Sequence, residues 1–470
     1  MKVPLTLLAA SLLLAACSNP APRPDSGLQP PVAWQSPNTA AAAHSNRQWW
    51  TQFGSPQLNR LIEQASVGSH DLAAAVARVQ QAQASATIAG APLLPELKAG
   101  LNANRQRLLH GKGYSQLDVS PDNRSLNYYD AELSASYEID FWGGKRAARD
   151  SALFGLQASE FDRATVELTL QSGVANSYTQ ALSLREQQRI AELNLANAQN
   201  VLRLVQTRYD AGSATALELA QQKSLVAEQQ RKLPLVQQQA REARITLAAL
   251  LGQPVQALTL AEQPFDQLHW PEIASGVPSE LLSRRPDIAS AEAKLAAAQA
   301  DVTVARAAML PKLTLTASLG TGADLASDLL RTTFYNLSSG LVAPVFNNGR
   351  LSAERDKATA RQQELLETYR GAIINGFADV EKALNSIRGL DEQRQWQGEE
   401  LSQAQSAFDI AQSRYQAGAE DLLTVLQTQR TLYAAQDLNV QLRLSRLQAS
   451  IALYKALGGG VAGALARCEL

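Results

Sequence analysis

The strongest constraint on this 470-residue chain is that its sequence repeats itself. Four landmarks of the first half return in the same order in the second half, most of them about 206 residues later. They are LPEL at 94–97 and LPKL at 310–313, FWGGK at 141–145 and FNNGR at 346–350, RYDAG at 208–212 and RYQAG at 414–418, and LG at 251–252 and 457–458. The pattern predicts two sequence repeats, at 49–257 and 278–458, joined by a linker at 258–277.

Each of these two sequence repeats contains two segments in which apolar and polar residues alternate, which is the period of a half-buried strand. These segments predict strands at about 95–107, 127–141, 311–321 and 334–346. The second is the longest, and it carries acids at four of its polar positions, which suits a water-filled lumen. A soluble sandwich has the same alternation, but this length also exceeds the roughly 9–11 residues of a strand that crosses a bilayer.

The number of strands limits how they could lie in a membrane. Four strands cannot close a barrel, because small barrels have about eight or more, and an open edge is not tolerated in lipid. If these strands lie in a membrane, several chains therefore share one barrel, with about eight strands from two chains or about twelve from three.

Four long helices are predicted at about 143–210, 214–251, 350–416 and 420–457, with a shorter helix at about 286–308. No proline interrupts the first, and about 65 helical residues extend for about 100 Å. Apolar residues in the second helix follow the heptad spacing of a coiled coil, at Leu233, Val236, Ala240, Ala243, Leu247 and Leu250. The helices are too polar to span a membrane, and the pattern favours hairpins that turn at Gly212 and Gly418.

The N-terminus predicts export and a lipid anchor. Residues 1–16 contain a short apolar run after Lys2 that is typical of a signal peptide and too short for a membrane span. LAAC at 14–17 resembles the lipobox of bacterial lipoproteins. This implies cleavage before Cys17, lipidation of Cys17 and, because Ser18 follows, sorting to the outer membrane. An ordinary cleavage site with an incidental cysteine is the alternative.

Two further segments lack periodicity. Residues 17–48 are rich in Pro, Ala, Ser and Asn and are predicted to form an extended segment behind the lipid. The C-terminal tail at 459–470 contains Cys468, which a lipidated Cys17 cannot bridge. Its thiol is therefore either an incidental surface group or a cross-linking group.

Composition and motifs exclude several classes of function. Lys plus Arg is 43 and Asp plus Glu is 44, and the net charge of −1 gives no electrostatic basis for binding nucleic acid. No GxSxG, HExxH or P-loop motif occurs, so the chain is predicted to be no enzyme, with no catalytic residue and no cofactor. Two cysteines and four scattered histidines exclude a multi-cysteine zinc site, and no metal site is predicted.

Four motifs together identify a family. They are YEIDFWG at 137–143, VPSELLSRRPDI at 277–288, the paired RYxAG turns at 208–212 and 414–418, and LYKALGG at 453–459. From the residues alone, Pro286 and Asp287 in the second motif suit the first turn of a helix. With these motifs the chain resembles the TolC/OprM-like outer membrane factors, specifically the lipoprotein (NodT-type) branch of these efflux channels.

The resemblance implies a mixed α and β membrane protein that is a homotrimer. Three chains would form a twelve-stranded outer-membrane β-barrel, with four strands per chain, continuous with a twelve-helix periplasmic α-barrel. An equatorial domain, including 258–277, would surround its middle. The implied function is the passive exit duct of a tripartite efflux system, lipid-anchored in the cell outer membrane. It would receive drugs or other small toxic compounds from an inner-membrane pump through a periplasmic adaptor (membrane fusion protein).

Two alternatives stay open at this point. An outer-membrane channel for type I protein secretion would have the same architecture. A lipid-anchored periplasmic coiled-coil scaffold would explain the lipobox and the helices, but not the alternating segments or their duplication.

Site residues carry over from the resemblance one position at a time. Tyr415 matches a gate tyrosine, Leu423 an apolar constriction and Glu218 an acid that latches the periplasmic gate. Glu420 stands where an arginine would complete that latch, and Thr424 and Gln427 stand where members often have aspartates. The expected adaptor-docking tips are Arg208, Tyr209, Gly212, Arg414 and Gly418. The plainer interpretations are a heptad core position for Leu423 and a solvated helix face for Glu218 and Glu420.

Overall fold

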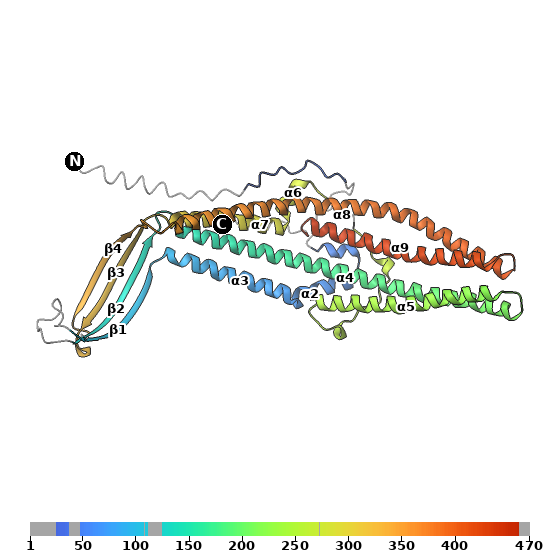
Figure 1. The fold of residues 1–470 in the computed structure, drawn as a ribbon, viewed down its shortest axis with the longest axis horizontal. Coiled ribbons are helices and arrows are strands. Elements are labelled where there is room, and N and C mark those ends of the chain that lie inside the picture. The colour runs from blue at the N-terminus through green and yellow to red at the C-terminus, as the bar shows by residue number, and fades with distance from the viewer. Residues whose placement is uncertain (1–24, 37–47, 108, 111–124, 272, 460–470) are drawn as a thin grey trace. The chain divides into compact units, whose positions relative to one another are not determined.

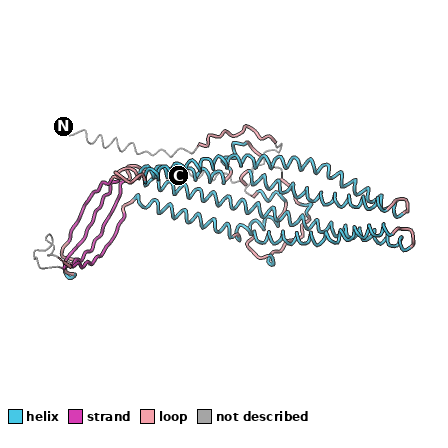
Figure 2. The backbone as a smooth tube through the Cα atoms, viewed as in Figure 1, coloured by secondary structure: helices cyan, strands magenta, loops and turns pink. Residues whose placement is uncertain are grey.

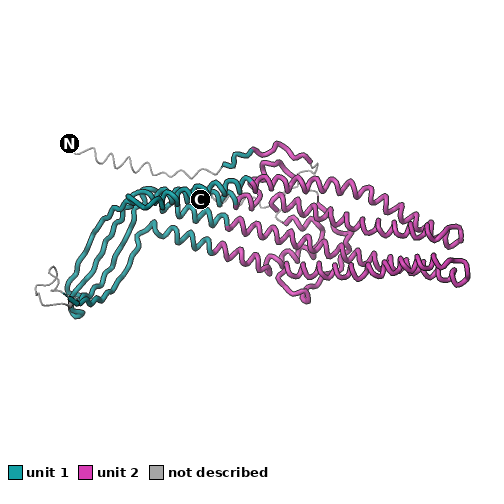
Figure 3. The backbone as a smooth tube through the Cα atoms, viewed as in Figure 1, with its two compact units in different colours: residues 1–28, 81–158, 291–370 teal, residues 29–80, 159–290, 371–470 magenta. Residues whose placement is uncertain are grey.

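The computed structural model describes residues 25–36, 48–107, 109–110, 125–271 and 273–459 (Figure 1). The predicted signal peptide at 1–16, Cys17 and Cys468 lie outside the described residues. The chain divides into two compact units (Figure 3). The first takes its described residues from 1–28, 81–158 and 291–370, and the second from 29–80, 159–290 and 371–470.

Helices and strands follow one another in the same order in both halves of the chain. Figure 2 shows which segments are helices and which are strands. The first half contains η1 (Trp49–Phe53), α2 (Pro56–Gly68), α3 (His70–Gly90), β1 (Glu96–Arg107), β2 (Ser125–Ile139), α4 (Gly144–Asp210) and α5 (Ala216–Leu250). The second half contains α6 (Pro278–Arg284), α7 (Pro286–Ala307), β3 (Lys312–Ala323), β4 (Thr333–Val342), α8 (Arg350–Gln416) and α9 (Leu422–Ala456). Within the described ranges, no helix is both long enough and apolar enough to cross a membrane.

The first unit contains one antiparallel sheet with the strand order β1-β2-β3-β4. Its register aligns apolar residues in rows across all four strands, which are Ala99–Leu133–Leu319–Tyr335 and Leu97–Ala135–Ala317–Leu337. Between them runs a polar row, Lys98–Ser134–Ser318–Asn336. Because successive side chains point to opposite faces, the sheet has one largely apolar face and one largely polar face. The apolar face is uncovered, since Leu97 is 70% and Leu337 is 73% exposed.

Two strands end earlier than the alternation predicts. β2 ends at Ile139 rather than 141, because the Asp140 carboxylate accepts hydrogen bonds from the backbone N–H groups of Lys145 (3.0 Å) and Arg146 (2.9 Å) at the start of α4. Asp140 therefore caps a helix instead of continuing the row of strand acids. β4 ends at Val342 rather than 346, and Pro344, which has no N–H to donate, follows.

The second unit has a large apolar core where short segments from both halves of the chain meet. Trp49 is fully buried and stacks on Tyr454, with ring centroids 5.0 Å apart. Burial raises the pKa of Tyr454 to about 12, and its hydroxyl donates to Gln52 Oε1 at 2.7 Å. A separate apolar cluster lies nearer the helix turns and includes Val205, Phe408, Tyr415, Val425 and Leu426. This second cluster holds the α4–α5 and α8–α9 hairpins together.

Candidate functional site

The turn between α4 and α5 is closed by a glycine in the left-handed conformation. The Ser213 N–H donates to Arg208 O (2.8 Å) and the Gly212 N–H donates to Tyr209 O (2.9 Å), which is the hydrogen-bond pattern of a Schellman motif. Gly212 has φ +74°, and a Cβ placed there would meet no atom within 4 Å. The α8–α9 turn repeats the motif around Gly418, with φ +78°. Glycine is needed for its backbone angle, and the space beside each turn is open.

The two turns are joined by Arg208, which reaches from α4 to the end of α8. Its Nη2 donates to Tyr415 O (2.6 Å) and to Gln416 O (3.3 Å), and the guanidinium lies 4.3 Å from the centroid of the Tyr415 ring. This contact satisfies carbonyls at the C-terminus of α8 and adds a cation–π interaction. We call this contact, between Arg208 and residues 415–416, the clasp.

Tyr415 itself is almost completely buried, at 2% exposure. Burial raises the pKa of Tyr415, although the Arg208 guanidinium over its ring opposes the shift. Its hydroxyl is buried and has no hydrogen-bond partner among the described residues. Such a group is rare in a native protein, so the ring position is set by packing and by the clasp rather than by the hydroxyl.

Glu218 has a local partner. Its carboxylate accepts from the Thr215 N–H (2.6 Å) and the Thr215 hydroxyl (2.9 Å), while the Glu218 N–H donates to Thr215 Oγ1 (3.2 Å). This reciprocal pair is a capping box at the N-terminus of α5. The Thr-x-x-Glu spacing at 215–218 is the sequence signal that predicts this capping box.

Glu420 is likewise held within its own turn. It forms an ion pair with Arg414 (3.2 Å), and Arg414 also donates to Ala419 O (3.3 Å). The next residue, Asp421, caps α9 by accepting from the Thr424 N–H at 2.8 Å. Hydrogen bonds to the carboxylate hold the pKa of Asp421 below its usual range. Both acids therefore stabilise the α8–α9 turn.

The remaining predicted gate residues lie on the first turns of α9. Leu423 is 61% exposed, Gln427 is exposed and Thr424 is half-buried, whereas Leu422, Val425 and Leu426 of the same turns are buried in the cluster. Leu423 is thus not a buried heptad core position within one chain. Tyr209, in the other turn, is 40% exposed.

The RRPDI motif forms a second polar site in the same unit. The Arg285 guanidinium donates to Asp287 through Nε (3.0 Å) and Nη2 (2.7 Å), to Asp379 (3.1 Å) and to Ala456 O (3.2 Å). Burial opposes the charge of Arg285, but the two carboxylates outweigh it and hold the pKa of Arg285 above its usual range. The Arg285 side chain thus connects the start of α7 to α8 and to the end of α9 through hydrogen bonds.

Neither site gathers the groups of an active centre. In the described ranges, no three or more His, Cys, Asp or Glu side chains gather in a way that could hold a metal ion. The hairpin turns present exposed side chains next to capped helix ends.

Comparison with known proteins identifies the family. The model of the outer membrane efflux protein family matches residues 61–253 and 277–459. The chain is 66% identical to the pyoverdine export outer membrane protein OpmQ of Pseudomonas aeruginosa, over 97% of this chain and 96% of that protein. It is 61% identical to OpmQ of Pseudomonas putida, over 97% of each.

The fold of this chain is similar to that of a solved structure of the outer-membrane channel OprN. It has a TM-score of 0.85 and 27% identity, and the match covers 93% of this chain and 98% of that one. The predicted fold class is confirmed, because the described residues form four strands and four long helices in the fold of an outer-membrane channel. The family consists of efflux channels rather than enzymes, which confirms the prediction of a non-catalytic protein. The chain belongs to the outer membrane efflux protein family and is an efflux channel of the outer membrane.

Proposed function

We propose that three copies of this chain form a passive exit duct, with a shared twelve-stranded barrel in the outer membrane and a twelve-helix barrel in the periplasm. The observation that carries this proposal is the sheet of the first unit, whose outer strands β1 and β4 each have one edge that no other described strand pairs with. Unpaired backbone groups are too costly in lipid, so β4 of one copy has to pair with β1 of the next until the ring closes.

The two faces of the sheet support this arrangement. The apolar rows, which are exposed to solvent in a single chain, would face lipid in the assembled barrel. Apolar side chains are favourable there. The opposite face carries Lys98, Asn102, Asp130 and Glu132, and Asn102 donates to Asp130 at 2.9 Å. Charged and amide side chains of this kind suit a water-filled lumen.

We also propose that the chain arose by tandem duplication, with repeats at 49–257 and 278–458 around an equatorial linker at 258–277. Equal element lengths support this, since α4 and α8 each have 67 residues and α5 and α9 each have 35. Each repeat then supplies two strands and one helical hairpin to the duct.

For the cargo, we propose that this channel exports pyoverdine, as the names of the relatives at 66% and 61% identity suggest. An inner-membrane pump would supply it through a periplasmic adaptor, and the open space around Gly212 and Gly418 would admit the adaptor's helices. Arg208, Tyr209 and Arg414 would complete the docking tips.

The gate would lie at the same turns. Three copies of the exposed Leu423 would converge as an apolar constriction, with Thr424 and Gln427 beside it. The clasp between Arg208 and Tyr415 would hold the α8–α9 hairpin in the closed position. Glu218 and Glu420 would act through the caps and turns that they stabilise rather than as a latch between hairpins.

Electron microscopy of the detergent-extracted, full-length protein tests the assembly directly. We expect a threefold tube with a detergent belt at one end, and a monomer or rods without a belt would refute the shared barrel. Loss of pyoverdine export in a deletion strain, restored by this chain, would support the cargo.

The lipid anchor has its own test. We propose that Cys17 carries the lipid, so labelling with radioactive palmitate should be lost in Cys17→Ala. Retention of the label in that variant would place the lipid elsewhere.

A further inference from the structure

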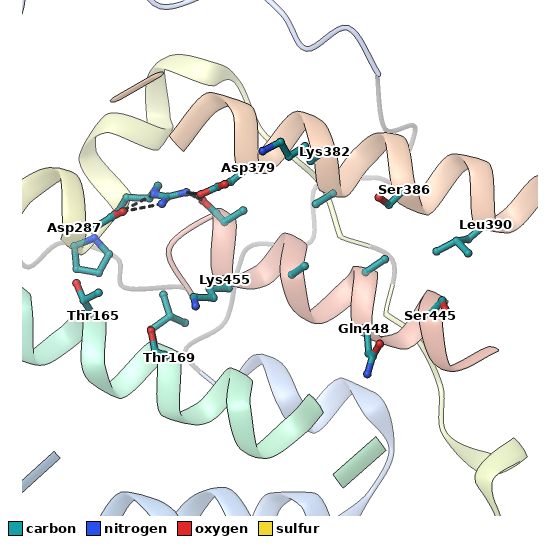
Figure 4. Close-up of a pocket in the computed structure, with 17 residues that line it drawn as sticks. Thr165, Thr169, Asp287, Asp379, Lys382, Ser386, Leu390, Ser445, Gln448 and Lys455 are labelled. Carbon is teal, nitrogen blue, oxygen red and sulfur yellow. Dashed lines mark hydrogen bonds and ion pairs between the residues drawn. The ribbon is translucent and has the colours of Figure 1, made fainter. Parts of the chain in front are cut away.

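The second unit contains a cavity that the gate and the docking tips do not use (Figure 4). Its volume is about 610 Å³, within the range of small-molecule pockets. It lies between α4, α8, α9 and the start of α7, and hydroxyl and amide groups line it at Thr165, Thr169, Ser386, Ser445 and Gln448. The apolar part of the wall consists of alanines of α8 and α9 together with Leu168, Pro286 and Leu390.

Three cations line this cavity, and only one of them is neutralised. Arg285 is committed to Asp287 and Asp379, as described above. Lys382 of α8 and Lys455 of α9 are exposed, and neither ammonium group has an ion pair or hydrogen bond to another described residue. Among the described residues, the lining therefore carries a net charge of about +1, and its two unpaired ammonium groups are available to a ligand.

The cavity borders the main apolar core, because Ala383 and Ala456 belong to both, but its polar lining comes from other faces of the helices. On α9, Leu444, Leu447 and Ile451 are buried in that core, whereas Ser445, Gln448 and Lys455 line the cavity. The same division holds on α4, where Val174 and Tyr178 face the core and Thr165 and Thr169 face the cavity. In a ring of helices surrounded by an equatorial domain, the face opposite that domain is the lumen.

We propose that this cavity is a transient binding subsite for carboxylate groups of solutes passing through the duct, with Lys382 and Lys455 as its cationic ligands. The placement in the lumen rests on the proposed function. A carboxylate can accept hydrogen bonds from either ammonium group, and the hydroxyl and amide groups bind the polar remainder of the solute. Because both lysines are exposed to water, each contact is weak, which suits a site that must release its ligand.

The test is fluorine NMR titration of the full-length protein in detergent with para-trifluoromethylbenzoate. The neutral para-trifluoromethylbenzamide has nearly the same shape and serves as the ligand control. We expect the wild-type protein to bind the benzoate more tightly than the benzamide. We expect Lys382→Gln/Lys455→Gln to weaken benzoate binding about tenfold and each single substitution about threefold, since each exposed ion pair contributes little.

The matched protein control is Lys223→Gln/Lys357→Gln, which removes the same charge from exposed lysines of α5 and α8 outside the cavity. This variant should bind the benzoate as the wild type does. An equal loss in both double variants would mean that net charge alone attracts the probe, and equal binding of benzamide would mean that the cavity is merely apolar. Either result overturns the proposal.

Failure of the subsite is distinguishable from failure of the duct. A threefold tube without any preference for the carboxylate would keep the duct and refute the subsite. Preference for the carboxylate by a protein that forms no tube would refute the duct and the luminal position of the cavity.

Discussion

Replacing Arg285 with methionine should destabilise the second unit more than any nearby change of charge. The side chain is only 11% exposed, and the substitution leaves the Asp287 and Asp379 carboxylates and Ala456 O without their shared cation. Removing one partner of a buried ion pair costs about 3–5 kcal/mol. Asp287 and Asp379 are 38% and 48% exposed, so water screens part of this loss, and we expect about 2 kcal/mol.

The neighbouring residue provides the control. Arg284 forms an ion pair with Glu280 at 2.9 Å, with side chains 39% and 46% exposed. Arg284→Met removes the same charge one position away, and we expect a loss of no more than about 0.5 kcal/mol. Thermal unfolding of the full-length protein, followed by circular dichroism at matched protein concentration, should show a midpoint roughly 2–4 °C lower for Arg285→Met.

The pH dependence of this difference has a defined sign. Burial raises the pKa of the Asp287 carboxyl, but Arg285 and backbone N–H groups outweigh it and hold the pKa below its usual range. A carboxyl with a lowered folded-state pKa stabilises the fold above its unfolded pKa of about 3.9, and this stability is lost as the pH falls through the folded value. In Arg285→Met the guanidinium is lost and only the backbone N–H groups oppose burial, so the pKa of Asp287 is higher than in the wild type and its protonation relieves the variant. The gap in stability between wild type and Arg285→Met should therefore narrow as the pH falls through roughly 4 toward the lowered pKa of Asp287. A constant gap, or an equal effect of Arg284→Met, would refute the reasoning.

The other predictions concern the hairpin turns. Gly212→Ala should lower local stability by about 1–2 kcal/mol, because φ +74° is strained for alanine, whereas Gly398→Ala inside α8, also with open space, should add about 1 kcal/mol. Hydrogen exchange at each position checks this, and effects of the same sign would contradict it. Leu423→Ser should raise single-channel conductance in planar bilayers, and an unchanged conductance would remove Leu423 from the gate. Arg208→Ala should also raise conductance. Arg208→Lys should bring the conductance only part of the way back to the wild-type value, because lysine lacks the planar guanidinium fork. Equal conductance in all three proteins would exclude the clasp from gating.

The fold class was predictable because its signals are local. Period-two alternation at residues such as Leu133 and Leu319 indicates strands, and heptads such as that from Leu233 indicate paired helices. The end of β4 at Val342 was not predicted, because the alternating pattern continues to Phe346 past Pro344. The carboxylate of Asp140 fits the alternation equally well as a strand acid, and only the fold assigns it to the start of α4.

The contacts at the candidate site were predictable only where both partners are close in sequence. Thr215 and Glu218 are three residues apart and carry a recognisable capping pattern. Arg208 and Tyr415 are 207 residues apart, and no local sequence pattern around either residue predicts the clasp. Arg285 likewise pairs with Asp287 locally, but its bond to Asp379 spans 94 residues and depends on how α7 packs against α8.

The two unpaired edges of the sheet have a genetic consequence. If a complete ring needs three sound chains, a defective copy that still pairs through β1 and β4 damages every assembly that it enters. In a cell expressing sound and defective copies equally, roughly one assembly in eight would contain only sound chains. A mutation at the hairpin turns that spares the strands should therefore be dominant, whereas one that prevents strand pairing should be recessive.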